Sequence, residues 1–203
     1  MTAAPNDSAR HAEKMKKKKA ARDKIMATKT QEKGLLIVHT GKGKGKSTAA
    51  FGMVFRALGQ GMKVAIVQFV KGAWATGEAK ALEKFADQVD IFIMGKGFTW
   101  ETQDKEADIA AAREAWAKAK ELINDDIHDM VLLDELNIVL RYDYLPVEEV
   151  VGVLQSRPAM KHVIVTGRNA RDELIEIADL VTEMALVKHP FRDGIKAQKG
   201  IEF

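Results

Sequence analysis

One stretch of fourteen residues constrains the fold of this chain more than any other: "HTGKGKGKSTAAFG", from His39 to Gly52. It joins a short apolar run, "LLIVHT", to a segment with helical periodicity, and Gly45-Lys46-Ser47 stands at the junction. A strand, a glycine-rich loop and a helix in this order form a phosphate-binding loop, whose backbone N–H groups and helix N-terminus face an anion. The alternative is a Gly/Lys-rich surface turn, which requires neither the strand nor the helix.

The loop departs from the general pattern G-x-x-x-x-G-K-[ST] at one position. The first glycine should stand at residue 40, where the chain has Thr40, and the glycines lie instead at 41, 43 and 45. Lys46 is expected to reach the terminal phosphates, and the Ser47 hydroxyl to reach a magnesium ion. Lys42 and Lys44 add positive charge around the same concavity, which indicates a triphosphate held differently from that of common ATPases.

Apolar strand-like runs alternate with helix-like segments along the chain. Strands are predicted at 35–40, 63–70, 89–95, 129–136, 161–168 and 180–187. Helices are predicted at 46–61, 77–86, 105–124, 146–157 and 171–178. The fold class that follows is α/β, P-loop NTPase-like (RecA-like): a doubly wound, mostly parallel sheet of about six strands flanked by helices.

In such a sheet the strands are covered on both faces, and ligands bind beyond their carboxyl ends. Five loops are therefore expected to meet the ligand: 40–47, 69–77, 94–104, 134–145 and 166–171.

Composition excludes several classes of protein. The 203 residues include no cysteine, so there is no disulfide framework and no thiolate metal site. No apolar run approaches the roughly 20 residues of a membrane span, and the N-terminus has no apolar signal core. A cytoplasmic location is expected.

The net charge of +3 is unevenly distributed. Residues 1–30 carry nine Lys/Arg and three Asp/Glu, a net +6, so the remainder is net negative. The chain is therefore divided into a basic arm, residues 1–30, and one domain, residues 31–203. The arm could bind nucleic acid through Glu13 to Lys24, "EKMKKKKAARDK". Its lack of aromatic residues for base stacking favours a solvated or partly helical arm.

A second nucleotide-binding element is "MVLLDEL", four apolar residues followed by acids. Asp134 or Glu135 is expected to bind magnesium directly or through water. In a hydrolase, Glu135 would instead activate water. The alternative is an acid that only caps the segment after the strand.

Aromatic residues stand in a polar loop after the third predicted strand, "MGKGFTWETQD", from Met94 to Asp104. Phe98 and Trp100 at the ligand end of the sheet need either a flat ligand or a core in which to bury themselves. The residues alone favour a role in anchoring the core.

Taken together, the motifs resemble the ATP:corrinoid adenosyltransferases of cobalamin synthesis and salvage. The matching pieces run in family order: "TGKGKGKSTAAFG", "VAIVQFVKG", "GFTWETQD", "LLDELNIVLRYDYLP", "VIVTGR" and "VKHPFRDGIKAQKGIE". They span roughly residues 34–203. In this family Thr40 is the ordinary residue, and Ser47 replaces a threonine that supplies the same ligand oxygen.

The resemblance implies the reaction. A Co(I) corrinoid attacks the 5′ carbon of ATP, which lies along the loop in a reversed sense, and tripolyphosphate leaves. The residues that it assigns to ATP are Gly41, Lys42, Gly43, Lys44, Gly45, Lys46, Ser47, Thr48, Arg56 and Arg168. Those that it assigns to the corrinoid are Met94, Phe98 and Trp100, and those assigned to Mg²⁺ (or Mn²⁺) are Ser47, Glu135 and Asp134. Lys46, Phe98 and Trp100 carry the catalytic roles.

The resemblance also implies partners. These are a reductase or flavoprotein that donates electrons and a second copy in a homodimer, in which the N-terminal segment folds over the corrinoid. Residues 1–30 contain none of the motifs quoted above. Two other functions stay open on the residues alone: a P-loop NTPase or kinase that acts on the terminal phosphate, and a nucleic-acid-binding module that uses the arm.

Overall fold

The computed structural model describes residues 5–70, 77–94 and 104–202. The chain divides into two compact units, Met1–Glu32 and Lys33–Phe203. The first unit contains one helix, α1 (Pro5–Ala27). Its side chains from Asp7 onward are all exposed, and an i,i+4 ion pair joins Lys17 to Glu13 at 2.8 Å. No helix in the described ranges is long and apolar enough to cross a membrane.

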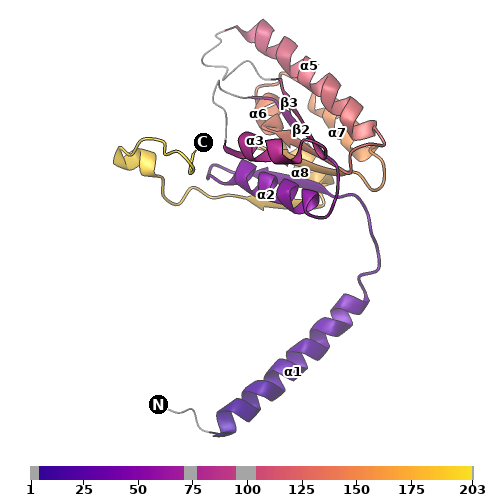
Figure 1. Ribbon diagram of the computed structural model, residues 1–203, viewed down its shortest axis with the longest axis vertical. Helices are drawn as coiled ribbons and strands as arrows, with labels where there is room; N and C mark the ends of the chain where they lie inside the picture. The colour runs from indigo at the N-terminus through magenta and orange to yellow at the C-terminus, as the bar shows by residue number, and fades with distance from the viewer. Residues whose placement is uncertain (1–4, 71–76, 95–103, 203) are drawn as a thin grey trace. The chain divides into compact units, whose positions relative to one another are not determined.

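The second unit is a sheet with helices on both faces (Figure 1). The strands are β1 (Leu36–Thr40), β2 (Val64–Gln68), β3 (Val89–Ile93), β4 (Met130–Asp134), β5 (His162–Thr166) and β6 (Leu180–Glu183). The helices are α2 (Lys46–Leu58), α3 (Gly77–Leu82), α5 (Lys105–Asn124), α6 (Leu136–Arg141), α7 (Val147–Gln155) and α8 (Asp172–Ile177), with 3₁₀ turns η1 (Glu83–Phe85) and η2 (Pro190–Asp193).

All six strands are parallel, in the order β3-β2-β4-β5-β1-β6. This confirms the predicted α/β class. β5 lies between β1, which leads into the glycine-rich loop, and β4, which ends in the acids. The carboxyl ends of β1, β5 and β4 therefore meet at one edge, so the loop and the acids become neighbours although they are far apart in sequence.

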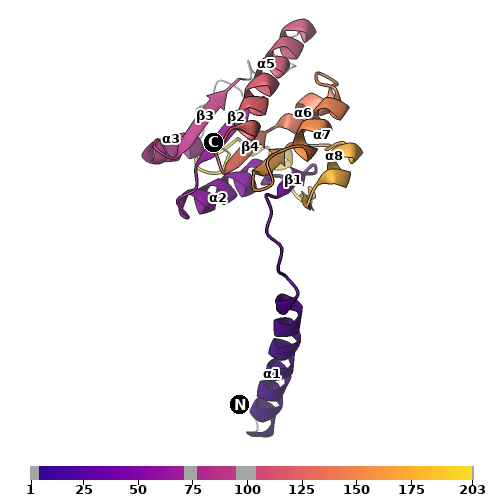
Figure 2. The same ribbon diagram turned by 90° about the vertical axis from the view of Figure 1, so that its right-hand side faces the viewer.

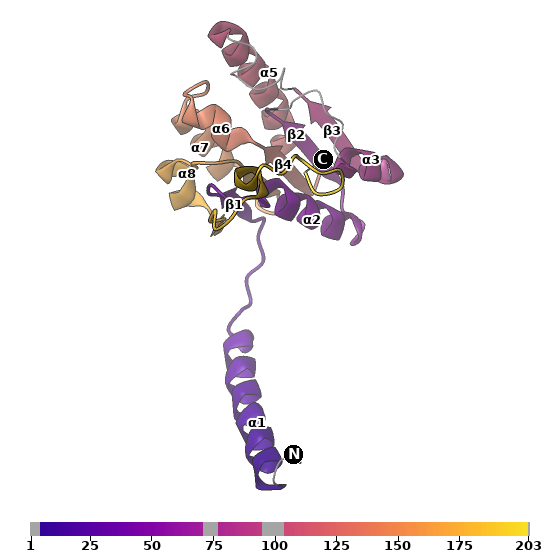
Figure 3. The ribbon, with the colours of Figure 1, turned by 90° about the vertical axis from the view of Figure 1, so that its left-hand side faces the viewer.

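Two apolar layers hold the helices to the sheet, one on each face. Figures 2 and 3 show the helices on these two faces. On one face α2 and the end of α3 pack on the sheet through side chains such as Val54 and Leu82. On the other face α5, α6, α7 and α8 pack through side chains such as Trp116 and Val150. Each large apolar side chain buried in this way contributes about 1.5–3 kcal/mol to stability.

Two expectations about this unit were wrong. Residues 134–145 are not a loop throughout, because they contain α6, which is too short to show a helical period in the sequence. The last strand ends at Glu183 rather than at residue 187, and all four of its residues are exposed. β6 is an edge strand, so the expectation of strands covered on both faces fails there.

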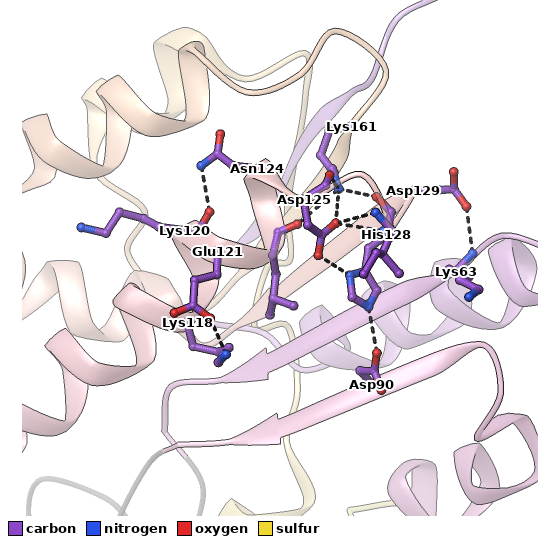
Figure 4. Close-up of polar contacts among 12 residues, drawn as sticks. Lys63, Asp90, Lys118, Lys120, Glu121, Asn124, Asp125, His128, Asp129 and Lys161 are labelled. Carbon is purple, nitrogen blue, oxygen red and sulfur yellow. Dashed lines mark hydrogen bonds and ion pairs between the residues drawn. The ribbon is translucent and has the colours of Figure 1, made fainter.

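A polar cluster lies at the end of α5, where the strands of the sheet begin and away from the glycine-rich loop (Figure 4). The buried ammonium of Lys161 donates to Asp125 Oδ1 at 3.0 Å and to the Asp125 carbonyl at 2.8 Å. The ring of His128 contacts the other carboxylate oxygen of Asp125 at 2.6 Å and Asp90 Oδ2 at 2.9 Å. This cluster joins α5 to strands β3, β4 and β5.

Candidate active site

The glycine-rich loop lies between the end of β1 and the start of α2 and needs its glycines for two reasons. Gly41 and Gly45 have φ of 99° and 103°, a left-handed conformation that costs little only for glycine. At Gly43 an added Cβ would lie 2.5 Å from the carbonyl oxygen of Ala185. The displaced glycines are thus required by this loop path.

Thr40, the residue that replaces the usual first glycine, ties the loop to its neighbour. The Thr40 hydroxyl accepts a hydrogen bond from the backbone N–H of Ala170 at 3.0 Å, and the side chain is buried. This bond connects the start of the loop to the segment between β5 and α8. A glycine at position 40 would leave the Ala170 N–H without this partner.

Lys46 lies buried at the first turn of α2, 6% exposed. Its Nζ donates to the Gly43 carbonyl oxygen at 2.5 Å. Burial lowers the pKa of Lys46; the nearby Glu135 opposes that shift, while Arg168 and Lys44 add to it. Burial, with help from Arg168, lowers the pKa of Lys44 in the same way. Three cations thus repel one another around the loop, an arrangement that an anion would relieve.

Glu135 follows β4 directly and faces this positive region. Its backbone is left-handed, with φ 63° and ψ 21°, and its carboxylate lies against Gly167, where an added Cβ would be 3.0 Å from Glu135 Oε2. Burial and the neighbouring Asp134 raise the pKa of Glu135 to about 7, against the opposing effect of Lys46 and Arg168. Glu135 Oε2 is buried and accepts no hydrogen bond from residues 5–70, 77–94 or 104–202. A buried carboxylate oxygen without a donor fits a cation site.

The Asp134 carboxylate, by contrast, already has hydrogen-bond partners on both oxygens. Oδ1 accepts from the Thr166 hydroxyl at 2.7 Å and Oδ2 accepts from the Gln68 side chain at 3.1 Å. Of the two acids expected to bind metal, Glu135 is therefore the one with an oxygen that has no hydrogen-bond partner among the described residues, and Asp134 is its neighbour in the chain.

Of the residues predicted for ATP and metal, most converge on this edge of the sheet. Ser47 is half-buried in the first turn of α2, while Lys42, Thr48 and Arg168 are exposed. Arg56 is also exposed but lies in the last turn of α2, about 15 Å along the helix from Lys46 at 1.5 Å per residue. The structure does not bring Arg56 beside the loop, and its role stays a prediction.

On the side predicted for the corrinoid, only Met94 can be located. It follows β3, packs half-buried against the apolar layer under α5, and its N–H donates to the Gln68 carbonyl at 3.1 Å. Phe98 and Trp100 lie outside the described residues.

The C-terminal segment also contacts the glycine-rich loop, and the sequence analysis did not predict this contact. Met184 accepts from the Gly43 N–H at 2.6 Å and donates to the Thr40 carbonyl at 2.9 Å. Glu202 forms an ion pair with Lys44. The one signal for this contact was the non-periodic "VKHPFRDGIKAQKGIE", whose conformation no sequence period specifies. No role was predicted for two further residues: Gln68, inside the predicted strand 63–70, and Thr166, which belonged to a loop expected to meet the ligand, 166–171, but was not singled out.

Comparison with known proteins identifies the family. The family model "ATP:corrinoid adenosyltransferase BtuR/CobO/CobP" matches residues 32–203, which includes the glycine-rich loop, the acids and the C-terminal segment. The chain belongs to this family of ATP:corrinoid adenosyltransferases. The enzyme is a transferase, as expected, and the alternative of an NTPase or kinase is not favoured.

Relatives support the same conclusion over the whole length of the adenosyltransferase. Three proteins named corrinoid adenosyltransferase are 65% identical (Sinorhizobium sp; 98% of this chain and 94% of the relative), 54% identical (Pseudomonas aeruginosa; 100% of each) and 48% identical (Escherichia coli; 96% and 98%). Among solved structures, the RadB recombinase aligns over 78% of each chain with a TM-score of 0.49 and 16% identity, a likeness that carries no argument about function.

A second family model, "Cob(I)alamin adenosyltransferase N terminal", matches residues 1–26 of the adenosyltransferase. The arm contained none of the motifs that carried the resemblance, so this match extends the family likeness to a segment whose sequence had shown only its charge and a possible helix.

Proposed function

We propose that the enzyme transfers the 5′-deoxyadenosyl group of ATP to the Co(I) centre of a corrinoid, forming adenosylcobalamin or its precursors. The cobalt electron pair forms the bond to C5′, the C5′–O bond breaks, and its electron pair leaves with tripolyphosphate. Family membership over residues 32–203 supports this reaction. The observation that carries the assignment of the site is the group of mutually repelling cations around the glycine-rich loop.

The loop would hold all three phosphates as one leaving group. Lys44, Lys46 and Arg168 supply positive charge on one side, and the loop amides supply hydrogen-bond donors. Such fixed donors stabilise the negative charge that builds up as the C5′–O bond breaks. Thr48 in the first turn of α2 and Arg56 farther along it are proposed as further nucleotide contacts.

The residues present also fit Mg²⁺ or Mn²⁺. Ser47 and Glu135 would hold the ion, with Asp134 beside them. The observation that supports this fit is Glu135 Oε2, which is buried and has no hydrogen-bond partner in the part of the chain that the structure describes. No group of three or more His, Asp or Glu in the described ranges could hold a metal unaided, so phosphate oxygens of ATP would complete the ligand set. Bound there, the ion supplies positive charge to the departing tripolyphosphate.

No protein base or nucleophile is required by this reaction, because the cobalt centre is itself the nucleophile. Positioning, stabilisation of charge and exclusion of water are the tasks left to the chain. Phe98, Trp100 and Met94 are proposed to present apolar faces to the lower side of the corrin. Faces that cannot ligate cobalt would displace its lower ligand and ease reduction from Co(II) to Co(I).

The remaining proposals concern partners and location. An electron-donating reductase or flavoprotein would deliver the electron for Co(I), and the enzyme would act in the cytoplasm as a homodimer. The arm, residues 1–30, would cover the corrinoid.

A single assay tests the reaction. The enzyme is incubated with ATP, Mg²⁺ and a chemically reduced corrinoid, and the absorption spectrum is followed for an adenosyl–cobalt product. We expect that product to form at a rate that requires all three components. A chain that hydrolyses ATP while the corrinoid spectrum stays unchanged would contradict the proposal.

A further inference from the structure

The last residues of neighbouring strands form a buried polar row at the ligand edge of the sheet. Gln68 of β2 and Asp134 of β4 are register partners, and Thr166 of β5 follows the pair formed by Leu133 and Val165. All three polar side chains are at most 5% exposed. The row is held by the two bonds that Asp134 accepts, from Thr166 at 2.7 Å and from Gln68 at 3.1 Å.

Thr166 differs from Gln68 because its hydroxyl makes two bonds of opposite sense. It donates its single hydrogen to Asp134 Oδ1, so its oxygen is free to accept, and it accepts from the Glu135 backbone N–H at 2.9 Å. One side chain therefore fixes the carboxylate of the first acid and the backbone of the second.

Thr166 holds the backbone of Glu135, whose conformation is energetically unfavourable. Glu135 is a non-glycine residue in the left-handed region, a conformation that costs of order 1 kcal/mol or more and persists only where the surroundings impose it. Gly167, the residue that follows β5, also contacts this turn. An added Cβ there would lie 2.8 Å from the Asn137 side chain and 3.0 Å from Glu135 Oε2, and the Gly167 carbonyl accepts from the Asn137 amide at 3.1 Å.

We propose that Thr166 is a positioning residue for the metal–triphosphate site: its hydroxyl occupies Asp134 and fixes the turn at Glu135, so that the Glu135 carboxylate is the acid presented to the cation. The inference rests on the proposed function and deepens it, because it assigns the two acids different tasks. Glu135 is the ligand, and Asp134 is an anchored neighbour that acts on the ion at most through water.

The alternative is a purely structural role, in which the Thr166 hydroxyl only provides hydrogen bonds to the buried Asp134 carboxylate and Glu135 N–H. Both the positioning role and the structural role predict a loss of stability when the hydroxyl is removed. Only the positioning role predicts a loss of cation affinity in a protein that remains folded, since partners behind a metal ligand change affinity by about 10–100-fold when they are removed.

The test uses Mn²⁺ as the probe, bound to the full-length enzyme together with ATP. Corrinoid is left out, so that no adenosyl acceptor is present and ATP is not consumed by transfer. Free Mn²⁺ is measured by electron paramagnetic resonance for the wild type, Thr166→Val and Thr166→Ser. The matched control is Thr182→Val, at the exposed residue of β6 that is register partner to His39 on the side away from Thr166. Thermal melting is recorded for every variant.

We expect Thr166→Val to bind Mn²⁺ about tenfold more weakly or worse, with Thr166→Ser and Thr182→Val within about twofold of the wild type. Wild-type Mn²⁺ affinity in a folded Thr166→Val protein would overturn the inference. If Thr166→Val does not fold, Thr166→Cys takes its place, and an affinity equal to that of Thr166→Ser would again overturn it. A wild-type enzyme that binds no Mn²⁺ with ATP would instead contradict the proposed metal site itself.

Discussion

The ammonium of Lys46 lies 2.5 Å from the carbonyl oxygen of Gly43, within its own loop. The chain itself thus supplies the oxygen partner of the buried Lys46 ammonium, and a phosphate oxygen of ATP would replace this partner.

We expect Lys46→Ala to reduce adenosyl transfer by about 100- to 1,000-fold, the loss typical of removing one group that stabilises developing charge. Steady-state rates with saturating reduced corrinoid measure it. Lys84→Ala, on the exposed η1 turn, is the control, and normal transfer by Lys46→Ala would contradict the loop assignment.

Glu202 forms an ion pair with Lys44, and we expect it to compete with the phosphates for this lysine. Because the pair is partly exposed to solvent, it stabilises the contact only weakly, by about 0.2–1 kcal/mol. Removing the negative charge with Glu202→Gln should therefore tighten binding of tripolyphosphate by up to about fivefold. Calorimetric titration measures the affinity, with the exposed Glu176→Gln as the matched control. Unchanged or weaker binding by Glu202→Gln would show that the ion pair does not oppose the substrate.

Phe98 and Trp100 are expected to act on the cobalt centre rather than on ATP. Replacing either with Ala should slow reduction of bound Co(II) corrinoid more than it weakens ATP affinity, because the apolar face that displaces the lower ligand is lost. Stopped-flow reduction and ATP titration separate the two effects. Phe191→Ala, at a phenylalanine 77% exposed in η2, controls for loss of an aromatic ring in general. Equal loss of reduction and ATP affinity would argue against this role.

The polar cluster at the amino edge of the sheet should govern stability in acid. Burial alone would raise the pKa of Asp125, but hydrogen bonds from the His128 amide and ring and from Lys161 outweigh it and lower the pKa to about 2. Because the folded-state pKa lies below the unfolded value of 3.8, this stabilisation is complete above about pH 4 and is lost as the pH falls towards 2.

We therefore expect Asp125→Asn to lower the free energy of unfolding by about 2–3 kcal/mol at pH 7, and to remove part of the dependence on pH below 4. Urea denaturation between pH 2 and pH 7 gives both quantities. Asp126→Asn, its exposed neighbour, should change neither. An Asp125→Asn protein that loses stability in acid as steeply as the wild type would disprove the assignment.

The sequence predicted those parts of the molecule that depend on local pattern. Apolar runs such as 64–67 and 130–133 are continuous because both faces of these strands are covered, and the glycines of the loop are required by its own backbone. The bonds that join Gln68, Asp134 and Thr166 depend instead on the order of the strands. Nothing in one sequence says that β5 lies between β1 and β4, so the sequence placed Thr166 in a loop at the ligand end of the sheet but not beside Asp134.

The C-terminal segment illustrates the other limit. Met184 and Glu202 contact the loop through a backbone carbonyl and one ion pair, and neither contact leaves a period in the sequence. The sequence also fails to mark the end of β6, because apolar residues continue to Val187 although the strand ends at Glu183.

The proposed function requires that all three phosphates leave the loop together. The most direct measurement is ³¹P NMR of the products after the enzyme has reacted with ATP, Mg²⁺ and reduced corrinoid. Intact tripolyphosphate, in amounts equal to the adenosyl–cobalt product, is the predicted result. ADP with inorganic phosphate as the products would contradict it.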